Sequence, residues 1–330
     1  MTPRRGRIGL LTLFAALALR GAVVGHAQPA AAEQATVIVV AGAPGEQEFA
    51  PDIKLQIEAW AKASEQAKAK YIAIGNAEAP EGDSGDHAAV KKAFADEAKE
   101  GTGELWIVLI GHGTFDGKEA KLNLRGPDIS ATEFSEWLKP FKRPIAIVDT
   151  TSSSAPFMAK LAARGRVIVT STRSGNEHNY ARFGKFLAEA LPDPKSDLDK
   201  DGQISLLESF LSASNRTKEF YKTEGRLATE HALLDDNGDG LGTPADWFRG
   251  VHATKRPKDG AAADGTRAHQ FHLVRSTAEQ QLPSEVRARR DKLELQLAEL
   301  RSTKAKMKED AYYKALEKIL LEIAALYEST

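Results

Sequence analysis

The sequence predicts an α/β fold in which a mostly parallel sheet is flanked by helices. Three observations lead to this fold class: short apolar runs recur along the chain, amphipathic segments of helical length alternate with them, and clusters rich in glycine and proline separate the two. The clearest apolar run is at residues 105–110 (LWIVLI), which is too short for a normal helix and leads directly into Gly111-His112-Gly113. Such a run is typical of a fully buried strand in a parallel sheet.

The other elements follow from the same alternation. Apolar runs predict further strands at residues 35–40, 71–74, 144–149 and 166–170. Amphipathic periodicity predicts helices at residues 51–69, 86–99, 155–163 and 180–191, and Ser130 opens a capping box for another helix. A small hairpin is expected at residues 114–124, with Asp116-Gly117 as its turn.

The first 27 residues predict a secretory signal peptide. Arginines at positions 4, 5 and 7 precede an apolar stretch at residues 8–19, and Gly25-His26-Ala27 is a cleavage site of the small-x-small type. The apolar stretch is too short to span a bilayer comfortably. We therefore expect an exported protein, periplasmic or secreted, without stable membrane insertion after the signal is cleaved.

Composition excludes several classes of chemistry. The chain has no cysteine, which rules out disulfides, thiolate metal sites and cysteine nucleophiles. Its formal net charge of -1 gives it no general attraction for polyanions. We therefore expect no nucleic-acid partner, and any catalysis must use hydroxyls, carboxylates, imidazole or a metal.

Polar side chains follow two of the predicted strands at the point where each strand ends. His112 and Gly113 follow the strand at 105–110, while Thr151 and Ser152 follow the strand that ends at Asp149. Because ligands of open α/β sheets bind beyond the carboxyl ends of the strands, these residues are expected to form a site at one edge. The alternative is that His112 merely ends its strand as a structural residue.

These residues resemble the caspase-like fold, and the nearer likeness is to its legumain-like branch and bacterial relatives. The resemblance covers about residues 36–191 and implies that His112 is the general base and that Gly113 supplies an oxyanion-hole amide. It implies a cysteine nucleophile two residues beyond Asp149. In this chain Thr151 stands at that position with Ser152 beside it, so the resemblance implies a peptidase scaffold without its nucleophile.

The missing thiol separates two function classes. A cysteine thiol is partly ionised near neutral pH, whereas a hydroxyl needs a base in direct contact and a third group to orient that base. Asp116 and Glu177 are nearby candidates for this third group, but acidic residues in loops are typically just solvated. We therefore favour a degenerate, inactive scaffold that acts as a binding or regulatory module for a peptide or protein partner. The alternative is a hydrolase that uses Ser152 or Thr151 with His112 as its base.

A second informative stretch, residues 197–208, fits the calcium loop of EF-hands at every position. Carboxylates stand at loop positions 1, 3 and 5, glycine at 6 and a glutamate at 12, which together provide the hard oxygens that calcium prefers. The predicted ligands are Asp197, Asp199, Asp201, Gln203, Ser205 and Glu208. The alternative is a solvated turn, because Ser205 and Glu208 also form a capping box for the next helix.

A second acidic loop at residues 235–246 matches the same pattern only in part. Asp235, Asn237 and Asp239 fill positions 1, 3 and 5, and Asp246 is a shorter residue at position 12. Position 8 is Gly242, where calcium loops carry an apolar residue. Weak calcium binding and an ordinary acidic turn are both compatible with this loop.

The domain organisation follows from these assignments. We expect a caspase- or legumain-like domain at residues 35–252 that includes both acidic loops, then a linker at 253–282, which is expected to be exposed at residues 255–267. Residues 283–330 carry two charged segments with apolar stripes and predict a helical hairpin or coiled coil. The hairpin either packs on the main domain or pairs with another copy, so self-association is one of its two expected roles.

Overall fold

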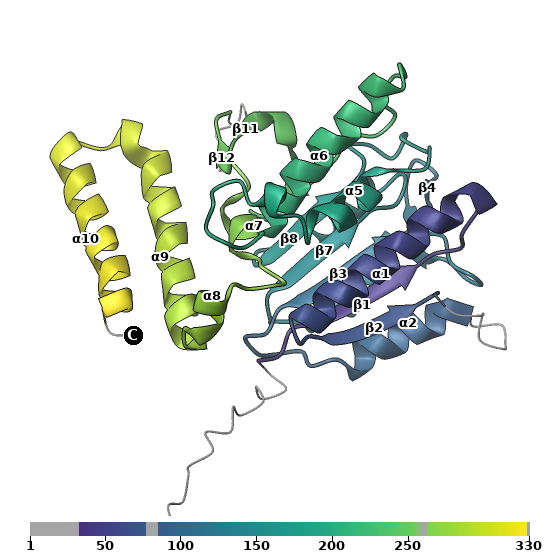
Figure 1. The fold of residues 1–330 in the computed structure, drawn as a ribbon, viewed down its shortest axis with the longest axis horizontal. Helices are drawn as coiled ribbons and strands as arrows, with labels where there is room; N and C mark the ends of the chain where they lie inside the picture. Colours follow the sequence, from purple (N-terminus) through teal and green to yellow (C-terminus); the bar gives the residue numbers. More distant parts are fainter. Residues whose placement is uncertain (1–32, 77–84, 256, 258–262, 329–330) are drawn as a thin grey trace, which may run out of the picture.

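The predicted α/β class is confirmed by a computed structural model, which describes residues 33–76, 85–255, 257 and 263–328. A seven-stranded, mostly parallel sheet forms the centre of the main domain, and helices cover both of its faces (Figure 1). The signal peptide predicted at residues 1–27 lies outside the described residues. Within the described part, no helix is long and apolar enough to cross a membrane.

Five parallel strands make up most of the sheet. In spatial order they are β2 (Lys70–Ile74), β1 (Thr36–Ala41), β3 (Leu105–Ile110), β7 (Ile145–Asp149) and β8 (Arg166–Thr170). All five coincide with predicted strands to within one residue at either end. In β3 and β7, Leu109 pairs with Asp149, so the two strands end side by side.

Two short strands that the sequence did not predict complete the sheet. β9 (Leu233–Asp235) pairs antiparallel with β8, and β10 (Thr243–Pro244) pairs antiparallel with β9. Both strands are too short to show a periodic pattern. Their position matters because β9 ends at Asp235, the first residue of the second acidic loop.

The two faces of the sheet bury separate apolar cores. Successive strand residues point to opposite faces, so Val108 belongs to one core and Leu109 to the other. The first core lies under α1 (Ala50–Gln66), α5 (Phe183–Ala190) and α6 (Leu206–Thr223), which cross in front of the sheet in Figure 1. The second lies under α2 (Gly85–Asp96), α3 (Ala131–Leu138) and α4 (Ala155–Leu161).

A small second sheet follows β3. It consists of β4 (Gly113–Phe115), β5 (Ala120–Leu122) and β6 (Ile129–Ser130) in antiparallel order. The hairpin predicted at residues 114–124 is confirmed, and its turn is held by the Asp116 carboxylate, which accepts hydrogen bonds from the amides of Lys118 and Glu119.

The second half of the linker predicted at residues 253–282 contains two short helices and packs on the main domain. After a small β11 (Phe248–Arg249) and β12 (His252–Ala253) ribbon, the chain forms α7 (Thr266–Gln270) and α8 (Thr277–Gln281). Ala268, Phe271 and Leu273 are buried in the first core, where the Phe271 ring lies 5.8 Å from that of Trp106. Glycine, alanine and charged residues dominate this stretch of the sequence. Composition alone therefore gave no sign that these three residues are buried.

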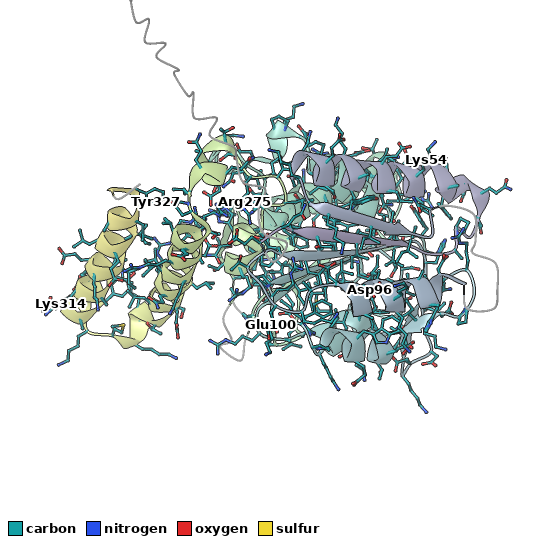
Figure 2. The ribbon with its side chains drawn as sticks, turned by 90° about the horizontal axis from the view of Figure 1, so that it is seen from below. Lys54, Asp96, Glu100, Arg275, Lys314 and Tyr327 are labelled. Atoms are coloured by element: carbon teal, nitrogen blue, oxygen red, sulfur yellow. The ribbon has the colours of Figure 1, made fainter. Side chains whose placement is uncertain are left out.

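The helical hairpin predicted at residues 283–330 is present. It consists of α9 (Ser284–Thr303) and α10 (Glu309–Glu328), and α9 rests on α7 through Gln270, whose amide donates to Asp291 and Glu294. Figure 2 shows the hairpin, with Lys314 and Tyr327 on α10, as a lobe beside the main domain. One side of α10 faces α9, while Leu321 on another side is 63% exposed.

Candidate functional site

The carboxyl ends of β3 and β7 bring the four residues predicted for the degenerate catalytic site together. β3 leads through Gly111 to His112 and Gly113, and β7 leads to Thr151 and Ser152. The two segments touch so closely at Gly113 that a Cβ there would come within 2.4 Å of the Ser152 carbonyl oxygen. Glycine is therefore required at position 113 by the approach of the two backbones.

His112 lies on the wall of a pocket of about 440 Å³. Its imidazole packs against Phe49 and Tyr180, whose rings stack on each other at 4.0 Å, and against the backbone of Gly45. Burial lowers the pKa of His112, with a partial opposing effect from Glu46. The imidazole is therefore neutral at neutral pH, and no described side chain hydrogen-bonds it.

The Ser152 hydroxyl is hydrogen-bonded to the backbone of Gly113. Ser152 is 1% exposed, its Oγ donates to the Gly113 carbonyl at 3.1 Å, and it accepts from the Gly113 amide at 3.1 Å. The resemblance assigns this same amide to an oxyanion hole. Here the N–H points at Ser152 instead, so both the hydroxyl and the amide are used to hold the two loops together.

The Thr151 hydroxyl is hydrogen-bonded to the carboxylate of Asp149, the last residue of β7. Its Oγ1 donates to Asp149 Oδ1 at 2.6 Å, and the Thr151 amide donates to the same oxygen at 3.0 Å. Asp149 is fully buried, which raises its pKa to about 7, and its Oδ2 has no partner among the described residues. Thr151 therefore pairs with Asp149 rather than with His112.

One serine–histidine pair was not predicted. The Oγ of Ser153 lies 3.1 Å from Nδ1 of His178, which is exposed and also lines the pocket. Ser153 has a φ of 54°, an uncommon left-handed conformation for a residue other than glycine. The serine run at 152–154 was visible in the sequence, but nothing in the sequence marked His178 as its neighbour.

These hydrogen bonds limit the chemistry that is available at this edge of the sheet. The pocket is lined by two imidazoles and by Glu46 and Asn123, which are residues able to hydrogen-bond a polar peptide group. A hydroxyl nucleophile needs a base in hydrogen-bond contact. Neither hydroxyl that the sequence nominated has His112 as that base, since Thr151 donates to the Asp149 carboxylate and Ser152 donates to the Gly113 carbonyl.

The first acidic loop gathers the carboxylates that the sequence predicted. Oxygens of Asp197, Asp199 and Asp201 lie within 4.8 Å of one another. Asp197 accepts hydrogen bonds from the amides of Lys200 and Gly202, both of which have left-handed φ angles, of 66° and 87° respectively. These amides hold the chain in a tight turn around the acidic side chains.

Glu208, the last predicted ligand of this loop, is completely buried below it. One of its oxygens accepts from the amides of Leu198 and Asp199, and the other accepts from the amide and hydroxyl of Ser205 at 2.8 Å each. The capping box is therefore present together with the loop, so the two readings of the sequence are not exclusive. Gln203 contributes its side-chain oxygen to the Ser276 amide.

An unpredicted histidine joins the first loop. His269 of α7 places Nε2 at 3.0 Å from Asp199, and these two residues and Glu208 also have ligand atoms within 4.8 Å of one another. A histidine 61 residues beyond Glu208 (269 minus 208) could not be assigned to this loop from spacing, because the residues of α7 were predicted to be part of a linker.

The second acidic loop has the same backbone form. Asp235 accepts from the amides of Gly238 and Gly240, whose φ angles are 83° and 73°. Asn237 and Asp239 accept from amides two residues later in the chain.

Asp246, the residue at position 12 of the second loop, does not face it. Its exposed carboxylate pairs with Lys255 at 3.0 Å. The loop instead receives the carboxylate of Asp264, which accepts from the amides of Asp236 and Asn237. Burial raises the pKa of Asp264 to about 8, and the neighbouring carboxylate of Asp236 adds to the effect.

Comparisons with known proteins found likeness only among solved structures. Caspase-1 from Spodoptera frugiperda is similar at 10% sequence identity and a TM-score of 0.41, over 62% of this chain and 87% of the caspase. The Drosophila initiator caspase Dronc is similar at 12% identity and a TM-score of 0.40, over 74% of this chain and 97% of that one. No protein-family model and no curated protein matches the chain.

Proposed function

We propose that this chain is an exported calcium-binding protein on a degenerate legumain-like peptidase scaffold, and that it acts as a binding or regulatory module without catalysis. The observation that carries the proposal is the first acidic loop, where three aspartates and the buried Glu208 gather around one tight turn. Like charges in such proximity destabilise the folded loop unless a cation neutralises them. Calcium fits because it takes about six to eight oxygen ligands in flexible geometry.

The loss of catalysis is supported by the hydrogen bonds at the edge of the sheet. Ser152 and Thr151 are both 1% exposed, and their hydroxyls are bonded to Gly113 and Asp149. To act as a nucleophile with His112 as its base, either side chain would have to break these bonds and reach His112. The pocket beside His112 remains open to a ligand, so binding of a peptide segment there without cleavage is the role we assign to it.

The C-terminal hairpin supports a role in assembly. Leu320 and Leu321 of α10 are 45% and 63% exposed, although the helix already buries another side against α9. Exposed apolar residues grouped on one helix are typical of a surface that binds another protein or a second copy.

Calorimetric titration with calcium tests the metal part of the proposal. The wild type should bind calcium with a dissociation constant on the order of 0.1 to 1 mM, the range of extracellular modules. Glu208→Gln should weaken binding strongly because it removes the charge of the bidentate ligand. Glu219→Gln is the matched control, since Glu219 lies on the exposed side of the same helix and pairs with the exposed Lys222. Absence of a calcium heat in the wild type would overturn this part.

A serine-reactive fluorophosphonate probe tests the catalytic part. We expect no covalent capture, and His112→Ala should leave any trace of esterase or peptidase turnover unchanged. Labelling that maps to Ser152 or Thr151 and disappears in His112→Ala would establish the alternative, a hydrolase with His112 as base. Labelling that maps to Ser153 and depends on His178 would also contradict the inactive scaffold.

A further inference from the structure

A second cavity, of about 810 Å³, lies at the edge of the sheet opposite to the pocket beside His112. Its lining includes Ala35, Glu104 and Pro144, which directly precede β1, β3 and β7, so it lies at the amino ends of the parallel strands. α7, α8 and the first half of α9 form its other wall. This volume is within the range of small-molecule sites, roughly 300 to 1,000 Å³.

The lining of this cavity, which we call the basic cavity, carries an excess of positive charge. Six lysine and arginine residues line it against four aspartate and glutamate residues, although the formal net charge of the whole chain is -1. Arg275, which Figure 2 shows where the main domain meets the C-terminal hairpin, is paired with Glu104. Arg290 is paired with Glu279 and Asp291. The other four basic residues have no ion pair within the described part of the chain, and they are Lys68, Arg267, Arg287 and Lys292.

Arg287 is held in place with part of its guanidinium unused. It is half-buried, and its Nη1 donates to the carbonyl oxygens of Glu279 and Leu282. Its Nε and Nη2 have no hydrogen-bond partner among the described residues. Burial lowers the pKa of Arg287, and the neighbouring Arg275 adds to this effect, yet a guanidinium stays charged at neutral pH. Nε and Nη2 form an edge with which a guanidinium binds two oxygens of one carboxylate or phosphate, so this edge is free to bind an anion.

The lining also contains a buried polar atom without a partner. His272 is 8% exposed, and its Nδ1 lies 3.3 Å from the carbonyl oxygen of Gln270. Its Nε2 has no hydrogen-bond partner within the described ranges of the chain. Since buried polar atoms nearly always have a partner, the lining holds a hydrogen-bonding group that the protein itself does not use. This observation is independent of the charges and is consistent with a lining that a bound molecule completes.

We propose that the basic cavity binds a small dianion, and that Nε and Nη2 of Arg287 hold one of its oxyanion groups. Carboxylate and phosphate share the geometry that this edge of the guanidinium recognises. The second oxyanion group balances the remaining cations, of which Lys68 and Arg267 line the side of the main domain. The site uses neither the first acidic loop nor the pocket beside His112, so it goes beyond the proposed function.

A bound dianion would join the C-terminal hairpin to the main domain. Arg287 and Lys292 belong to α9, whereas Lys68 lies between α1 and β2 and Arg267 lies on α7. Cations on the two walls repel one another, and an anion between them replaces this repulsion by attraction. Binding of the dianion should therefore stabilise the docking of the hairpin on the main domain.

Isothermal titration calorimetry of the full-length protein at low ionic strength tests the site, with succinate and glycerol 2-phosphate as dianions and acetate as a monoanion. We expect the wild type to bind at least one dianion at millimolar concentration and to bind acetate at least about tenfold more weakly. Arg287→Gln should weaken binding of the dianion at least about tenfold, because it removes a charged contact to two oxygens. Lys68→Gln should weaken it about two- to fivefold, and this exposed residue keeps the test valid if Arg287→Gln fails to fold.

Arg289→Gln is the matched control, since Arg289 lies on the same helix, is exposed and does not line the basic cavity. This variant should bind the dianion as the wild type does. Binding of succinate alone would identify the ligand as a carboxylate, and binding of glycerol 2-phosphate alone would identify it as a phosphate ester. No binding of either dianion, or equal weakening in Arg287→Gln and Arg289→Gln, would overturn the proposal. None of these results depends on calcium, so the proposed function is tested separately.

Discussion

Replacing Ser152 by alanine should destabilise the protein without changing any catalytic activity. The hydroxyl of Ser152 both accepts from the Gly113 amide and donates to the Gly113 carbonyl, at 3.1 Å in each case. Gly113 and Ser152 are buried, although both also line the pocket beside His112. The substitution removes a single oxygen atom, which leaves almost no cavity, and its cost therefore comes from the two unsatisfied groups.

The size of the stability loss follows from the number of unsatisfied backbone groups, which is two. A buried donor or acceptor without a partner costs about 1 to 3 kcal/mol. Since the two groups belong to one residue and can relax together, we expect the free energy of unfolding to fall by about 2 to 4 kcal/mol.

Urea unfolding in the presence of calcium measures this change, and Ser153→Ala is the matched control. Ser153 is equally buried and lies in the same turn, but its hydroxyl contacts His178, which is exposed and can bond to water instead. Ser153→Ala should therefore cost less than Ser152→Ala. Equal stability of the two variants, or turnover that vanishes in Ser152→Ala alone, would refute the structural role of Ser152.

Three further predictions concern other parts of the molecule. Asp149→Asn should flatten the pH dependence of stability: burial raises the pKa of Asp149 from 3.8 to about 7, so the native state keeps a proton that the unfolded state loses. The free energy of unfolding of the wild type should thus fall by up to about 4 kcal/mol as the pH rises from about 4 through 7. Urea unfolding at several pH values measures this, and an equal change of the unfolding free energy with pH in both proteins would count against it. Deleting residues 284–330 should lower the melting temperature or change the mass seen by light scattering, and no change in either would make the hairpin an independent appendage. Leu321→Glu should weaken any self-association in sedimentation, whereas the control Lys314→Glu on the same helix should not; equal behaviour would exclude this face of α10.

The fold was largely predictable because its central strands are continuous apolar runs. Residues 105–110 and 145–149 can be buried on both sides only within a sheet that helices cover, and the glycine after the first run marks where it ends. β9 and β10 escaped prediction because strands of two or three residues have no period to detect. Their pairing depends on β8, which is distant in the sequence.

The side-chain contacts within the sites were predictable only where their residues are consecutive. The first acidic loop could be recognised because its ligands follow one another at fixed spacing within twelve residues, from Asp197 to Glu208. Asp264 and His269 could not be placed, since they reach the loops only after α7 packs on the main domain. For the same reason, the spacing of Thr151 and Ser152 from His112 did not predict which groups their hydroxyls contact. Those contacts depend on how the segments after β3 and β7 lie against each other.

Thermal melting of the wild type with a chelator and with millimolar calcium tests the central claim most directly. A cation that binds only the folded state stabilises it by mass action, by about 2.7 kcal/mol when free calcium exceeds the dissociation constant a hundredfold. We predict that calcium raises the melting temperature of the wild type and raises that of Glu208→Gln much less. Wild-type curves that superimpose with and without calcium would show that the aspartates form a solvated turn and would contradict the account.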